Sequence, residues 1–78
     1  MKTWKFDDHA IQIRGLEHGR PHVHVITPDH VASMSIADGE VIAGAVPSKI
    51  EKKARKWVAG NEKELMDWWA KSTAARAK

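Results

Sequence analysis

The sequence predicts an α+β fold: a three- to four-stranded antiparallel meander followed by one or two C-terminal helices packed on one sheet face. Two observations predict this class. Between residues 10 and 42 apolar and polar residues alternate in short runs separated by turn residues, which is typical of strands. After Gly44 the apolar residues recur at helical spacing instead. Strands followed by helices, rather than alternating with them, indicate α+β architecture.

The chain has 78 residues, which is enough for one domain spanning residues 1–78. It contains no cysteine, so disulfides, thiolate metal sites and cysteine nucleophiles are excluded. No segment approaches the roughly 20 apolar residues that a membrane span needs. Since the N-terminus also lacks the apolar run of a signal peptide, we expect a cytoplasmic protein without membrane contact. The formal net charge of +3 permits contact with RNA or an acidic partner and requires neither.

The strand assignments follow from alternation and from turn chemistry. In the first strand Ile11 and Ile13 face inward. Pro28 and Asp29 form the turn between the second and third strands. Asp38 and Gly39 tolerate positive φ, so they predict the next hairpin. The predicted strands are residues 10–14, 21–26, 31–37 and a short strand that begins at residues 40–42.

The helix assignments rest on caps and on one apolar stripe. Ser48 and Glu51 have the spacing of a capping box. Gly60 is a natural stop, and Asn61 can cap a second helix, separate from or continuous with the first. The tail at residues 71–78 is small and basic, and we expect it to fray. The apolar stripes consist of Ile50, Ala54, Trp57 and Val58, then Leu65, Trp68 and Trp69. Because tryptophans lie near both ends of the chain, we expect the ends to meet over the sheet.

The register of the central hairpin decides where its histidines point. With Pro28 and Asp29 as a two-residue loop, Val25 faces Ala32 and Val23 faces Met34, which gives one apolar face. A slip by one residue would mix these valines with serines. His22 and His24 therefore lie on the opposite, polar face beside Ser33 and Ser35, and we expect both imidazoles to be at least partly exposed.

Three interpretations of this histidine pair remain open. The first is a solvated sheet face without further function. The second is acid–base chemistry by His22 and His24 at an RNA phosphate, with Arg20 or Arg14 as the phosphate contact and no metal. The third is a zinc or nickel site, because His-x-His on a strand can direct two nitrogens toward one ion. Its ligands would be His22 and His24 together with His18 or Glu17. His9 and His30 are expected to be structural.

Four lysines recur at spacings of three and four residues on the first predicted helix. They form either a solvated helix face or a patch that follows a phosphate backbone. No aromatic residue is interleaved on that face, so the sequence does not support base stacking there. The candidate binding residues are Lys49, Lys52, Lys53 and Lys56 on the helix, together with His18 and Arg20 before the second strand.

The segment from Glu17 to Val25 reads Glu-His-Gly-Arg-Pro-His-Val-His-Val. It resembles the signature of a small bacterial family known as domain of unknown function 4160, with a valine at position 23 where the family often has phenylalanine. The similarity continues through the segments at residues 32–36 and 38–44 and through the Trp57 helix to the Trp68 region. It covers about residues 9 to 69.

The resemblance implies a bacterial, cytosolic protein without a settled activity. It also implies an association with toxin–antitoxin pairs, in which the partner is a second small protein from the same operon. The resulting hypotheses are a toxin–antitoxin-type module that binds RNA or a partner through the histidine face, a non-catalytic interaction module that pairs through an edge strand, and a histidine-based metal-binding protein.

Overall fold

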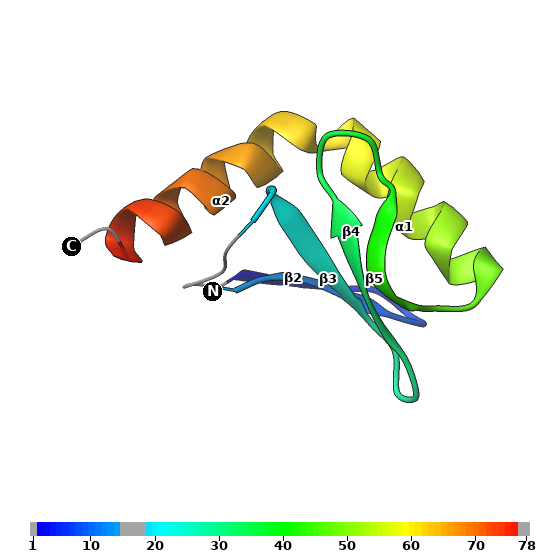
Figure 1. Cartoon of the computed structure of the whole chain (residues 1–78). Helices are drawn as coiled ribbons and strands as arrows, with labels where there is room; N and C mark the ends of the chain where they lie inside the picture. The colour runs from blue at the N-terminus through cyan, green and yellow to red at the C-terminus, as the bar shows by residue number, and fades with distance from the viewer. Residues whose placement is uncertain (1, 15–18, 77–78) are drawn as a thin grey trace.

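The computed structural model describes residues 2–14 and 19–76. Its sheet has five antiparallel strands in chain order, and two helices follow (Figure 1). The predicted α+β class is confirmed, with one more strand than expected. The elements are β1 (Lys2–Lys5), β2 (Ala10–Ile13), β3 (His22–Ile26), β4 (Val31–Ser35), β5 (Val41–Ala45), α1 (Ser48–Gly60) and α2 (Glu62–Arg76).

The additional strand is β1, which the sequence did not predict. Lys-Thr-Trp-Lys has a single apolar residue and shows no alternation by itself. The strand forms by pairing with β2, where Trp4 lies opposite Ile11. Trp4 also packs against Trp57 of α1, with ring centroids 5.3 Å apart. A strand this polar is fixed by its partner and by one aromatic contact, and neither is visible in a local sequence pattern.

The predicted register of the central hairpin is confirmed. Val23 pairs with Met34 and Val25 with Ala32. Both valines are fully buried. The next pairing is less regular, because the β4–β5 register shifts between Ser33 and Met34. Gly44 adopts a φ of +71°, and a side chain there would overlap the Val31 carbonyl oxygen, so only glycine fits this approach of β5 to β4.

The two helices are separate, and the predicted capping box is wrong, whereas Asn61 lies directly before α2 and its backbone carbonyl accepts from the Leu65 amide. The N-cap of α1 is Pro47, and Ser48 makes no capping bond because it already lies inside the first turn. Glu51 instead accepts a hydrogen bond from the Arg55 guanidinium one turn later. Asn61 does not cap α2 with its side chain; its Nδ2 donates to the Trp57 carbonyl oxygen and so satisfies the end of α1.

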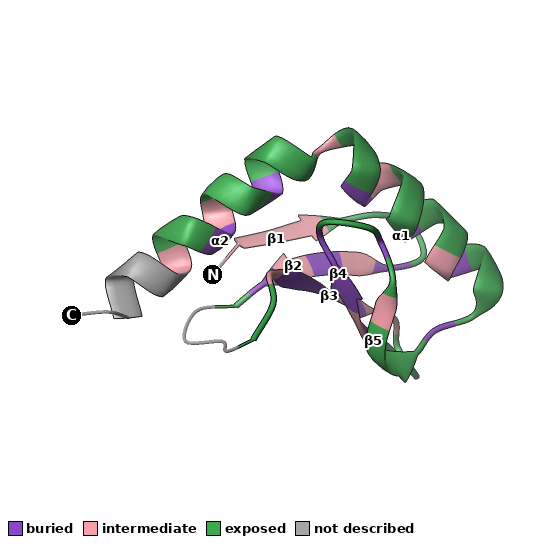
Figure 2. Cartoon of the chain, turned by 45° about the horizontal axis from the view of Figure 1, so that its top comes forward, coloured by how far each residue is buried: buried purple, intermediate pink, exposed green. Residues whose placement is uncertain are grey.

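Both helices lie on the same face of the sheet (Figure 2). The core fills the layer between the helices and the sheet. Buried side chains line the sides of the helices that face the strands, while their outer sides are exposed. The ends of the chain meet there as predicted, since the Lys2 ammonium lies 5.5 Å from the Trp68 ring centroid. The core consists of Ile11, Ile13, Val23, Val25, Ala32, Met34, Ile36, Val46, Ile50, Ala54, Val58, Leu65 and Trp69.

Candidate functional site

The sheet face turned away from the helices, which we call the outer face, carries a polar row. Register places one residue of each strand in this row, and no described helix covers it. Neighbours in the row bond to each other, since the Gln12 amide donates to the Thr3 hydroxyl at 3.1 Å. The row consists of Thr3, Gln12, His24, Ser33 and Ala43.

His24 contributes to a hollow on this outer face. The hollow has a volume of about 290 Å³ and is shallow, because most of the residues beneath it are small. His24 is half-buried, as expected for this register. Arg14 reaches the same hollow, where its Nε donates to the side-chain Oε1 of Gln12 at 2.8 Å. The lining residues are Arg14, His24, Val31, Ala32, Ser33, Ala43 and Gly44.

His22 is buried, so the expectation that both imidazoles are exposed is wrong for this residue. It occupies the first position of β3, at the end of the sheet, where α2 reaches over it. Its ring centroid lies 5.0 Å from that of Trp69 and 5.1 Å from that of His24. No local sequence pattern indicates the Trp69 contact, because the two residues lie far apart in the chain.

The tautomer of His22 follows from its hydrogen bond. Nδ1 lies 2.8 Å from the Arg20 carbonyl oxygen, which can only accept, so Nδ1 carries the proton and donates. In the neutral ring Nε2 is then an acceptor, and it makes no hydrogen bond with the described residues.

Arg20 lies beside Asp38, and Asp38 belongs to the turn that follows β4. The pKa of Asp38 is lowered chiefly by the hydrogen bond from the Glu40 amide, and also by the Ser35 hydroxyl and the Arg20 charge. Arg20 therefore already faces an acidic neighbour. Of the two arginines proposed as phosphate contacts, the structure places Arg14 in the hollow with His24 and places Arg20 near Asp38.

The lysines of α1 lie on the opposite side of the sheet from the histidines. All four are exposed, and α1 turns Ile50, Ala54 and Val58 toward the core. Lys53 forms an ion pair with Asp8 at 2.7 Å. The structure thus places Lys49, Lys52, Lys53 and Lys56 on the helical side of the sheet, apart from the outer-face hollow that holds His24 and Arg14.

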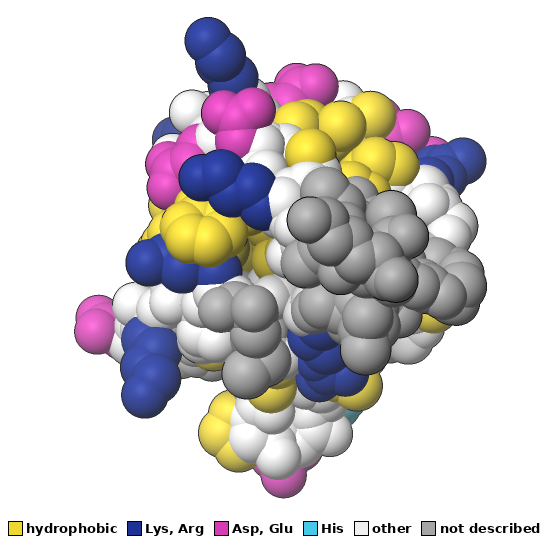
Figure 3. All heavy atoms as spheres, turned by 90° about the vertical axis from the view of Figure 1, so that its left-hand side faces the viewer, with side chains coloured by type: hydrophobic (Ala, Val, Ile, Leu, Met, Phe, Trp, Pro, Cys, Tyr) yellow, Lys and Arg dark blue, Asp and Glu magenta, His cyan; other side chains and the backbone are white. Residues whose placement is uncertain are grey.

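A second group of basic residues lies where the chain ends meet. Lys2 and Lys71 place their ammonium groups 5.5 and 5.1 Å from the Trp68 ring centroid. Figure 3 looks at the molecule from this side and shows dark blue side chains around hydrophobic surface. Trp68 neighbours Trp69, which packs on His22, so this basic surface lies at the same end of the domain as His22.

Two of the four residues named as possible metal ligands, His22 and His24, lie in the described part of the chain. The rings of His22 and His24 are in edge-to-face contact, and no group of three or more metal-binding side chains occurs in residues 2–14 and 19–76. Glu17 and His18 lie outside the described residues. A zinc or nickel site at this position stays a prediction.

Fold and site together define a small α+β protein with helices on one sheet face and a polar, histidine-bearing outer face. The family model described as Domain of unknown function (DUF4160) matches residues 11–70, and the chain belongs to this family. No curated protein and no solved structure matches the chain. In the described part of the chain, no helix is long and apolar enough to cross a membrane.

Proposed function

We propose that this chain is a cytoplasmic toxin–antitoxin-type module that binds RNA on its outer sheet face. The observation that supports it is the placement of Arg14 and His24 in one hollow on the face that the described helices leave open. Residues 22–25 of the segment that resembles the family signature belong to β3, and His24 among them lines this hollow.

The chemistry of the hollow suits a phosphate group. The Arg14 guanidinium uses its Nε on Gln12 and keeps its terminal nitrogens for an anion, to which it can donate two parallel bonds. Ser33 adds a hydroxyl and His24 an imidazole from the neighbouring strands. Small residues around them leave room for the backbone of a single strand to approach the sheet.

The histidine pair also supports an acid–base role in RNA cleavage. In such a step one imidazole takes the proton of a ribose 2′-hydroxyl while the 2′-oxygen forms a bond to phosphorus. The bond from phosphorus to the 5′-oxygen breaks, and the second imidazole, protonated at the start, gives its proton to that oxygen. His24 lies at the hollow and His22 offers its Nε2, so His24 is the candidate nearer to the substrate.

Binding is tested with a fluorescein-labelled single-stranded RNA of about 12 nucleotides, by anisotropy at low salt. Arg14→Gln and His24→Ala should each weaken binding severalfold and keep the fold. The matched control is Lys56→Gln, which removes one exposed charge on the other side of the domain. Equal weakening by all three changes would indicate attraction to net charge alone and would contradict the proposed site.

Cleavage is tested separately, with the same RNA and with a version that carries a 2′-deoxyribose at every position. Loss of cleavage on the deoxy strand, together with retained binding, would support the 2′-hydroxyl mechanism. Binding without cleavage of either strand would leave RNA binding as the function and exclude the catalytic role of His22 and His24.

A second candidate function is pairing of a partner protein with the edge strand β5. The other edge, β1, ends in Lys2 and Lys5, whose charges discourage pairing, whereas β5 carries no charged side chain and its residues 42–45 are exposed. The partner would be the second small protein of the operon. Ile42→Lys, which adds a charge to this edge, should abolish co-purification with that protein, whereas Met66→Lys on α2 should not.

A further inference from the structure

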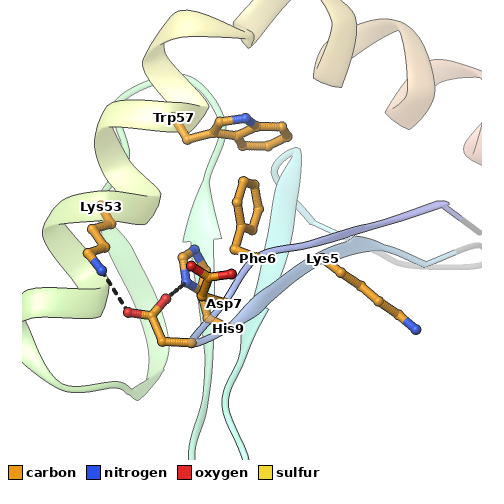
Figure 4. A pocket seen from close by; sticks show the side chains of 7 residues that line it. Lys5, Phe6, Asp7, His9, Lys53 and Trp57 are labelled. Carbon is orange, nitrogen blue, oxygen red and sulfur yellow. Dashed lines mark hydrogen bonds and ion pairs between the residues drawn. The ribbon is translucent and has the colours of Figure 1, made fainter.

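A second hollow lies between the turn that joins β1 to β2 and the part of α1 that carries Lys53 and Trp57. Its volume is about 490 Å³, and Figure 4 shows its side chains. Phe6 comes from the turn and Trp57 from the helix, so the hollow exists only because these segments pack together. The outer-face site does not include any of its residues. The lining residues are Lys5, Phe6, Asp7, Asp8, His9, Lys53 and Trp57.

Aromatic rings form the walls of this hollow. The Phe6 ring stands edge-on to Trp57, with centroids 5.4 Å apart and planes at 75°. Its other neighbour is His9, which stacks on it at 4.7 Å and 12°. Phe6 is nevertheless 37% exposed, which is high because phenylalanine is usually buried in folded proteins. A planar group could cover these rings.

His9 contributes an acceptor that has no partner. Its side chain is only 4% exposed, and Nδ1 lies 2.6 Å from the Asp8 carboxylate, which fixes the proton on Nδ1. The other ring nitrogen, Nε2, makes no hydrogen bond with the described residues. Because His9 lines the hollow, Nε2 of the neutral ring is an acceptor for a donor that enters there.

The charges at the hollow leave a second free acceptor, the Asp7 carboxylate. Asp8 is occupied, since it binds both Lys53 and His9, and these contacts lower its pKa to about 2. Lys5 points away from the rings in Figure 4. Asp7 lines the hollow and makes no hydrogen bond or ion pair with the part of the chain that the structure describes.

We infer that this hollow binds the guanidinium group of an arginine side chain from a partner protein. A guanidinium is planar and cationic, stacks on aromatic faces, and carries five donors in a fixed fork. One of its faces can cover the exposed part of the Phe6 ring, and its donors match the Asp7 carboxylate. Of the two lysines at the hollow, Lys53 is paired with Asp8 and Lys5 points away from the rings, so Asp7 is the charge that an entering group meets, and it favours a cation over a phosphate.

The test uses N-acetyl-arginine amide as the probe and reads the indole N–H signal of Trp57 by NMR. We expect a saturable shift with a dissociation constant in the millimolar range, as is reasonable for one side chain. N-acetyl-lysine amide, which is cationic without the planar fork, should bind several times more weakly. N-acetyl-glutamine amide, planar at its end but neutral, should give no saturable shift.

Variants assign the contacts. Asp7→Asn and Phe6→Ala should each weaken arginine amide binding about tenfold, while Asp67→Asn on α2 should leave it unchanged. Equal binding of lysine and arginine amides, or full binding by the Asp7→Asn variant, would overturn the inference. Since Asp7 lies outside the outer-face site, RNA binding by this variant should be intact, and so the two proposals fail independently.

Discussion

The imidazole of His22 packs against the indole of Trp69, with their ring centroids 5.0 Å apart. This contact joins the first residue of β3 to α2. It also holds the ring that donates to the Arg20 carbonyl oxygen, so α2 helps to set the orientation of His22. The helix therefore supports the histidine pair from a position that is far away in sequence.

Replacing Trp69 with alanine should destabilise the protein by about 3–5 kcal/mol, the usual cost of removing a large aromatic side chain from a core. Urea unfolding followed by circular dichroism measures this. Met66→Ala, at an exposed position of the same helix, should change stability by less than about 1 kcal/mol. Similar losses for both variants would show that Trp69 is not a core residue.

Gly44→Ala should destabilise the sheet. The positive φ alone costs a residue with a side chain about 1–3 kcal/mol, and the new methyl group would also overlap the Val31 carbonyl oxygen. Gly60→Ala serves as the matched change, since it has open space around it at the end of α1 and should be neutral or slightly stabilising. The measurement is the thermal unfolding midpoint of each variant. A Gly44→Ala protein as stable as wild type would contradict the β4–β5 geometry.

The Asp8 contacts predict a dependence of stability on pH. The folded-state pKa of Asp8 is about 2, below the ordinary value of 3.8, and the hydrogen bond from Lys53 is the main cause. This contribution is complete above about pH 4 and is lost as the pH falls toward 2. In urea titrations between pH 7 and 2, Asp8→Asn should lower stability near neutrality and flatten the acid limb. A variant that keeps the wild-type pH profile would show that Asp8 does not cause it.

The separation of the lysines from the outer face predicts unequal effects on RNA binding. Arg14→Gln should reduce the slope of log affinity against log salt by about one, the value for one lost phosphate contact. The double change Lys52→Gln, Lys56→Gln should leave this slope nearly unchanged, because both side chains lie on the other side of the domain. A larger effect of the lysine pair would place the RNA on α1 instead.

Local sequence patterns were sufficient for some parts of the fold and not for others. The alternation through Val23 and Val25 predicted the β3–β4 register, because a slip by one residue would expose the whole apolar set. The capping box was wrong because Ser48 begins the helix rather than preceding it. Asn61 lies at the predicted boundary, but its side chain bonds to the end of α1. A cap depends on a boundary of one residue, which composition does not specify.

The candidate sites were predicted even less completely. The sequence singled out His22 and His24 but could not show that Trp69 covers one of them. It found no aromatic residue among the lysines of α1, yet Phe6 packs against Trp57 beside Lys53 because the β1–β2 turn folds onto that helix. His9 gave no signal at all, since its environment comes from Phe6 and Asp8 in a turn whose shape the alternation pattern does not describe.

The sequence by itself determined the order from β2 to the helices and the face of β3 on which each side chain lies, because both follow from periodicity along a short stretch of chain. Only the tertiary structure decided which side chains meet. The packing of Trp4 on Trp57, the cover over His22 and the contact of Phe6 with Trp57 each join segments that are distant in sequence. Their geometry depends on how the helices pack on the sheet, which no local pattern encodes.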